Sequence, residues 1–170
     1  VIYGAYKTSG YRNGDYMDND MIKTYSYRIS QATRSQLVVI TYDIVIDYLS
    51  EAVQKDDSGF KESLHMAMRG IDQLITGLDM KYDVSVQLYQ LYNYMKRSLI
   101  NAQVSCDHEK VNEVSGLMKK LRASFLEVSR QDTSEPLMKN TEKVYSGLTY
   151  SRYGANEMAQ DTLGNRGYKA

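Results

Sequence analysis

Residues 37–49, LVVITYDIVIDYL, place apolar side chains on nearly every side of a helix. A helix packed on a single core needs an apolar stripe about 100° wide or slightly more, with polar residues elsewhere. The clearly polar positions here are Thr41, Asp43 and Asp47, and both aspartates share one narrow face with Glu51. The run is shorter than the about 20 apolar residues that a membrane-spanning helix needs. The pattern therefore predicts a central helix, or one that divides its sides between a core and a partner.

Four segments follow the helical period. The first is expected to begin after Thr33, because Thr33 and Gln36 form a capping-box pair, and to end near Lys55. The second is expected to start at a cap on Asp57 or Ser58 and to end at a turn in residues 78–83. The third is expected from about Val84 to Val104, and the fourth from near Asp107, which can cap it. Their links are short, which favours antiparallel neighbours. The sequence predicts an all-α fold, an antiparallel four-helix up-down bundle.

Tyrosine is concentrated at the two ends of the chain. Six of the sixteen tyrosines lie in the first 30 residues and four in the last 30, among Gly, Ser and Asn. Neither end shows sustained periodicity, so both are expected to be flexible arms. The predicted division is an N-terminal arm at 1–32 in which a short helix can form, a bundle domain at 33–130 and a C-terminal tail at 131–170.

The charge balance argues against several partners. Lys plus Arg equals Asp plus Glu, 21 each, so nothing in the total favours nucleic acid or an acidic lipid surface. Lys119, Lys120 and Arg122 are expected to form a wet outer face. The first ten residues, VIYGAYKTSG, lack a signal-peptide core. The single cysteine, Cys106, fits a reducing compartment. We expect a cytoplasmic protein without membrane insertion.

Candidate catalytic and metal-binding groups are few. Glu62 and His65 have the Glu-x-x-His spacing of a di-metal carboxylate site, which also needs a second such motif and further inward carboxylates. Both residues fall on the polar face of their helix. Asp43 and Asp47 are a carboxylate pair without an accompanying nucleophile or glycine-rich loop, so a solvated stripe or a cap for a neighbouring backbone is favoured. The sequence predicts no enzyme, no metal and no cofactor.

Apolar and tyrosine surface in excess of one core is the remaining signal. Tyrosine and methionine are favoured at protein interfaces because they offer large contact areas with a polar or adaptable edge. One alternative is that the tyrosines complete the bundle core with their hydroxyls reaching water. Another is that Tyr25, Tyr27 and Ile29 fold back and cover the apolar surface themselves.

Two sequence blocks resemble the FliS family of flagellar export chaperones. They are ATRSQLVVITYDIVIDYLSEA and TGLDMKYDVSVQLYQLYNYMKRSLINA. That family characteristically reads Ala-Ser-Pro-x-x-Leu before a helix with Leu-Tyr-Asp-Gly, then a Leu-Asp-Met turn leading into Leu-Tyr-x-Tyr-Met. The similarity spans roughly residues 22–130. In this chain Arg34 replaces the proline, Ile44 replaces the glycine after Tyr-Asp, and Tyr82-Asp83 replaces a glycine pair.

The resemblance implies a cytoplasmic bundle that binds the C-terminal segment of flagellin, prevents its premature polymerisation and aids its delivery to the export apparatus. Components of that apparatus are a second expected class of partner. Ile44 is expected to block the close approach that a glycine would allow. The alternative is a non-catalytic structural or regulatory bundle that self-associates or binds another client. The partner-binding residues predicted from apolar excess and motif position are Tyr25, Tyr27, Leu37, Ile40, Ile44, Tyr48, Tyr89 and Tyr92.

Overall fold

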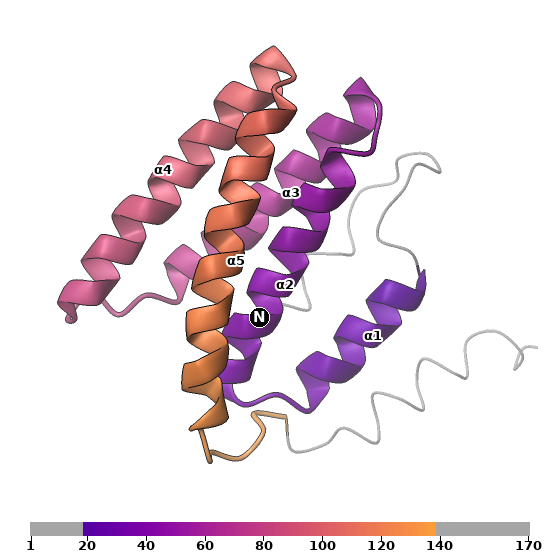
Figure 1. Cartoon of the computed structure of the whole chain (residues 1–170). Helices are drawn as coiled ribbons and strands as arrows, with labels where there is room; N and C mark the ends of the chain where they lie inside the picture. The colour runs from indigo at the N-terminus through magenta and orange to yellow at the C-terminus, as the bar shows by residue number, and fades with distance from the viewer. Residues whose placement is uncertain (1–18, 139–170) are drawn as a thin grey trace, which may run out of the picture. The chain divides into compact units, whose positions relative to one another are not determined.

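The computed structural model describes residues 19–138, which form five α-helices (Figure 1). They are α1 (Asn19–Ser30), α2 (Arg34–Ala52), α3 (Asp57–Thr76), α4 (Asp83–Ser105) and α5 (His108–Arg130). This stretch contains no strand, which confirms the predicted all-α class. Residues 1–18 and 139–170, most of the two predicted arms, lie outside the described residues.

Helices α2 to α5 form the predicted four-helix bundle. Helix α2 packs against α3 and α5, and α4 also packs against α3 and α5. Consecutive helices are therefore neighbours, α5 returns beside α2, and α2 and α4 occupy diagonal corners (Figure 1). The short links leave consecutive helices antiparallel, as in an up-down bundle.

Helices α2, α3 and α5 begin at side-chain caps. The Thr33 hydroxyl accepts a hydrogen bond from the Gln36 amide N–H, and the Gln36 side chain accepts one from the Thr33 N–H, so the predicted capping box is confirmed. Helix α5 begins after Asp107, also as predicted. Helix α3 is capped by Asp56 and not by Asp57 or Ser58. Asp56 has extended backbone and accepts from the Gly59 N–H at 3.0 Å, whereas Asp57 is already helical.

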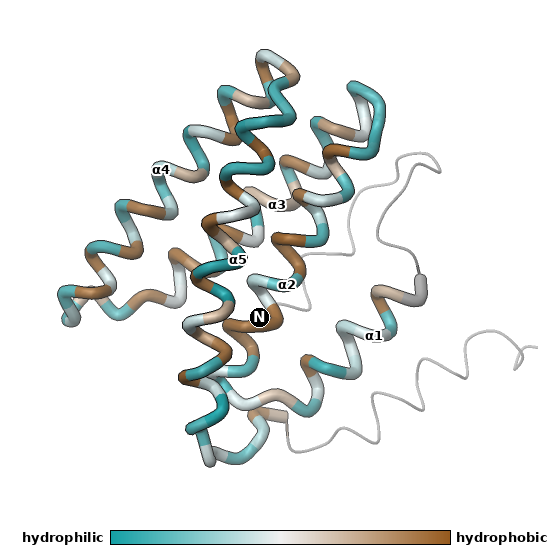
Figure 2. The backbone as a smooth tube through the Cα atoms, in the orientation of Figure 1, coloured by the Kyte–Doolittle hydropathy of each residue, from teal (hydrophilic) through white to brown (hydrophobic). Residues whose placement is uncertain are grey.

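Side chains from all four bundle helices fill the core, and apolar residues recur along α2 (Figure 2). Tyr42 of α2 and Tyr92 of α4, both fully buried, are hydrogen-bonded to each other through their hydroxyls across the diagonal; we call them the tyrosine pair. Burial raises the pKa of both phenols. Gly70 of α3 allows a close approach to α2, because a Cβ atom there would lie 2.4 Å from Cγ2 of Val45.

The start of α2 is also tied to residues that follow α5. The Ser35 hydroxyl donates a hydrogen bond to the Asp132 carboxylate, and the Leu137 N–H donates to the Ala32 carbonyl oxygen at 3.1 Å. Hydrogen bonds from Ser134 and Ser35 hold the pKa of Asp132 well below its usual range. The first residues of the predicted C-terminal tail are therefore anchored to the link between α1 and α2.

Candidate partner-binding surface

Helix α4 carries an apolar stripe on the side that faces away from the core. Val86, Tyr89, Ile100 and Val104 are separated by 3, 11 and 4 positions, which places them on one helical face. All are exposed, Val104 to 85%. We call these residues the α4 stripe. The opposite side of α4 supplies the core residues, so the stripe has no partner among the described helices.

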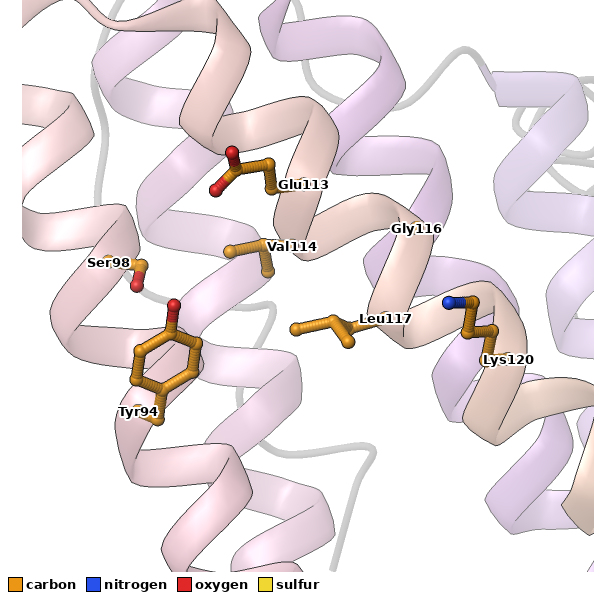
Figure 3. A pocket seen from close by; sticks show the side chains of 7 residues that line it. All are labelled: Tyr94, Ser98, Glu113, Val114, Gly116, Leu117 and Lys120. Carbon is orange, nitrogen blue, oxygen red and sulfur yellow. The ribbon is translucent and has the colours of Figure 1, made fainter.

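An open hollow of about 270 Å³ lies between α4 and α5 (Figure 3). Gly116 contributes to it because a Cβ atom at this position would meet no neighbouring atom within 4 Å. The hollow combines a tyrosine and aliphatic side chains with one acid and one lysine. Its lining residues are Tyr94, Ser98, Glu113, Val114, Gly116, Leu117 and Lys120.

Helix α1 covers a second apolar surface, on α2. We define the α2 outer face as Leu37, Ile40, Asp43, Ile44 and Asp47, which share one side of the helix. Ile40 is buried in a small cluster separate from the main core, formed with residues of α1 and the following link. The cluster also contains Tyr25 and Ala32, with Met21, Ile29, Leu37 and Ile44 packed around it. Ile44 packs against both this cluster and the main core.

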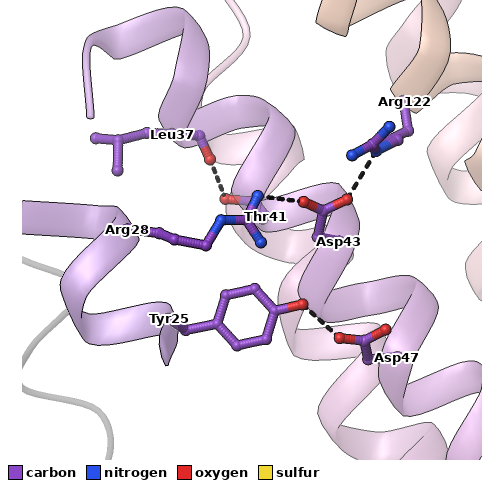
Figure 4. Close-up of polar contacts among 7 residues, drawn as sticks. All are labelled: Tyr25, Arg28, Leu37, Thr41, Asp43, Asp47 and Arg122. Atoms are coloured by element: carbon purple, nitrogen blue, oxygen red, sulfur yellow. Dashed lines mark hydrogen bonds and ion pairs between the residues drawn. The ribbon is translucent and has the colours of Figure 1, made fainter. Parts of the chain in front are cut away.

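The polar part of the α2 outer face is fully engaged (Figure 4). The Arg28 guanidinium of α1 pairs with Oδ2 of Asp43 at 2.5 Å, and Arg122 of α5 pairs with Oδ1 of the same carboxylate at 2.7 Å. The Tyr25 hydroxyl donates a hydrogen bond to Asp47. Arg28 also lies over the Tyr25 ring, 5.3 Å from its centroid. A short helix with little apolar burial is thus held by directional charged contacts.

These contacts correct two predictions made from the sequence. Asp43 and Asp47 do not form a solvated stripe: the Asp43 side chain is 14% exposed and bridges two arginines. Arg122 does not join a wet basic face, because it turns toward α2. The reason is that α1 and α5 flank this side of α2. Burial, reinforced by the hydrogen bond to Asp47, raises the pKa of Tyr25, so its hydroxyl stays a neutral donor.

The structure separates the predicted partner-binding residues into three groups. Tyr25, Leu37, Ile40 and Ile44 meet at the contact between α1 and α2. Tyr27 and Tyr89 are exposed, on α1 and on the α4 stripe respectively.

Two predicted partner-binding residues belong to the core instead. Tyr48 is 7% exposed and packs in the main core, and Tyr92 is 1% exposed. Tyr92 is buried because its hydroxyl is satisfied by Tyr42, which lets the whole phenol enter the bundle. Helical spacing did not distinguish these inward tyrosines from the outward Tyr89.

Within residues 19–138 no group of three or more His, Cys, Asp or Glu side chains is placed to hold a metal ion. Glu62 and His65 are exposed on α3. Among the helices described here, none combines the length and apolar character needed to cross a membrane.

Two comparisons agree with this architecture and its motif blocks. The family model described as flagellar protein FliS matches residues 17–132, a range that contains all five described helices. The flagellar secretion chaperone FliS of Salmonella typhimurium (strain LT2) is 28% identical over 102 residues, covering 59% of this chain and 67% of that protein. Because the family match extends over well more than half of the chain and includes both motif blocks, the chain belongs to the FliS family.

Proposed function

We propose that this protein is a cytoplasmic flagellar secretion chaperone that binds the C-terminal segment of flagellin and keeps it unpolymerised until export. The observation that carries the proposal is the apolar part of the α2 outer face, a cluster separate from the main core that α1 and the link after it cover within the described residues. Family membership and the secretion-chaperone name of the Salmonella relative support the same class of function.

The α4 stripe supports a client that is long and wraps the bundle. It lies on the helix diagonal to α2, so a single segment that contacts both surfaces has to pass around the bundle. A disordered client loses conformational entropy on binding and needs a long apolar track to offset that loss. About 40 residues, if helical, would run along two helices of about 30 Å each.

The test is a calorimetric titration of the protein with the last about 40 residues of flagellin from the same organism. The expected result is a one-to-one complex of micromolar or tighter affinity, with a negative heat-capacity change from apolar burial. Absence of both heat and co-elution would contradict the proposal. Val86→Ser on the α4 stripe should weaken binding by up to about tenfold, since it removes apolar area from the contact. Val128→Ser, at an exposed valine of α5 outside both surfaces, is the matched control.

The second candidate is self-association through the same apolar surfaces. The exposed α4 stripe favours it, because uncovered apolar patches are also used between copies of one protein. Size measurements across a range of protein concentrations distinguish the two functions. Self-association shifts the size with concentration alone, whereas a chaperone shifts only when the flagellin segment is added.

A further inference from the structure

We propose that Asp43 and Asp47 determine which segment the α2 outer face accepts: an amphipathic helix with a cationic side chain opposite Asp43 and a hydrogen-bond donor opposite Asp47. The inference rests on the proposed function, because it specifies the chemistry of the client segment that takes the place of α1. The two carboxylates would thus be specificity-determining residues as well as anchors for α1.

Helix α1 displays the chemistry that this surface accepts. Met21, Tyr25 and Ile29 recur every four residues and so lie along one side of α1, where they pack around Ile40. Arg28, next to Ile29, reaches Asp43 from the edge of that side. The surface therefore combines an apolar strip with two acceptors beside it, a pattern that fits a helix bearing both apolar and cationic residues.

The two oxygens of Asp43 have separate partners, and this makes the site selective. Arg122 belongs to the bundle and stays with Oδ1 when α1 leaves, whereas Oδ2 loses Arg28. Asp47 loses the Tyr25 hydroxyl at the same time. One cation, Arg122, then remains against two anions, so the uncovered surface carries a net charge of −1. A purely apolar or acidic segment would leave these acceptors unpaired, and unpaired charged groups are a strong source of rejection.

The experiment uses the full chain carrying Tyr25→Asp and Arg28→Glu, the release variant, in which new carboxylates repel Asp47 and Asp43 and detach α1. Circular dichroism and thermal unfolding check that its bundle is folded. Three labelled probes are titrated by fluorescence anisotropy at two salt concentrations. They are the flagellin C-terminal segment, a peptide of residues 19–33, and the same peptide with Arg28→Glu.

The native peptide should bind the release variant about tenfold more tightly than the Arg28→Glu peptide, as expected for one charge-assisted contact. Added Asp43→Asn should remove this difference and reduce the salt dependence of flagellin binding. Added Asp72→Asn is the matched control, because Asp72 pairs with Lys96 between α3 and α4, away from the α2 outer face.

Equal binding of the two peptides to the release variant would overturn the inference. Unchanged flagellin affinity and salt dependence after Asp43→Asn would also overturn it while leaving the chaperone function intact. If the release variant prefers the native peptide over the Arg28→Glu peptide but does not bind flagellin, the proposed chemistry of the surface is supported and the proposed chaperone function is contradicted. If the release variant dimerises as its concentration rises, and Asp43→Asn abolishes this dimerisation, the surface binds a second copy of this chain and the inference about the client segment is overturned.

Discussion

The tyrosine pair predicts how the stability of single and double Phe variants should compare, because its two buried hydroxyls satisfy each other. Replacing either Tyr42 or Tyr92 by Phe leaves the other hydroxyl buried without its partner. Leaving a buried polar group unsatisfied costs about 1–3 kcal/mol. Replacing both removes the pair together and loses only its net contribution, about 0.5–1.5 kcal/mol. The double variant should therefore be more stable than at least one of the single variants.

Urea unfolding followed by circular dichroism measures the effect. With a slope of about 2 kcal/mol per molar urea, a loss of about 2 kcal/mol lowers the midpoint by about 1 M. Tyr89→Phe on the exposed α4 stripe is the control and should change stability by less than about 0.5 kcal/mol. If the double variant loses the sum of the two single losses, the hydroxyls do not satisfy each other and the reasoning fails. None of these core variants should change flagellin affinity.

Three further predictions concern packing, pH and α1. Gly70→Ala should destabilise the protein by about 1–2 kcal/mol, because the cost of overpacking against Val45 exceeds the gain of about 1 kcal/mol in helix propensity. Adding Val45→Ala should relieve the clash. If urea unfolding shows that the stability losses of the two single variants simply add in the double variant, this explanation is wrong. The free energy of unfolding should fall as pH rises above about 10. Phenols ionise there in the unfolded chain, whereas in the folded protein the pKa of Tyr25 and of the tyrosine pair is raised. Replacing these tyrosines by Phe should make the urea midpoint depend less on pH between about pH 8 and 11. Deleting residues 1–30 should tighten flagellin binding about tenfold in calorimetry by removing the competing helix, and an unchanged or weaker affinity would show that α1 is not a cover.

Local sequence signals accounted for the bundle helices. Thr33 with Gln36, and Asp107 before α5, fixed two starts through side-chain caps, which are interactions between residues three apart. The α3 cap was predicted one or two positions too late, because the consecutive residues Asp56, Asp57 and Ser58 can all cap a helix. The choice among them depends on backbone conformation, which composition does not specify.

The candidate surface was only partly predictable. Apolar excess along residues 37–49 correctly identified a helix with more than one covered side. Leu37 and Ile40 belong to the separate cluster with α1, and Ile44 packs against both that cluster and the main core. The polar partners were missed. Asp43 meets Arg28 and Arg122 from positions 15 and 79 residues away, and no local period links such distant residues. The spacing of Asp43 and Asp47 placed them on one face of α2 but did not indicate which side chains would contact them.

The sequence by itself determined the elements: helical period, caps and short links are local properties, and together they specify an up-down bundle of the FliS type. Tertiary structure decided which side of each tyrosine-bearing helix turns inward, because the burial of Tyr92 depends on Tyr42 and that of Tyr25 on Asp47. It also decided that α1 lies on α2. The contact between α1 and α2 consists of a few apolar side chains and of polar contacts to two carboxylates. The free energy of those polar contacts depends on the distance between groups that come together only in the folded chain.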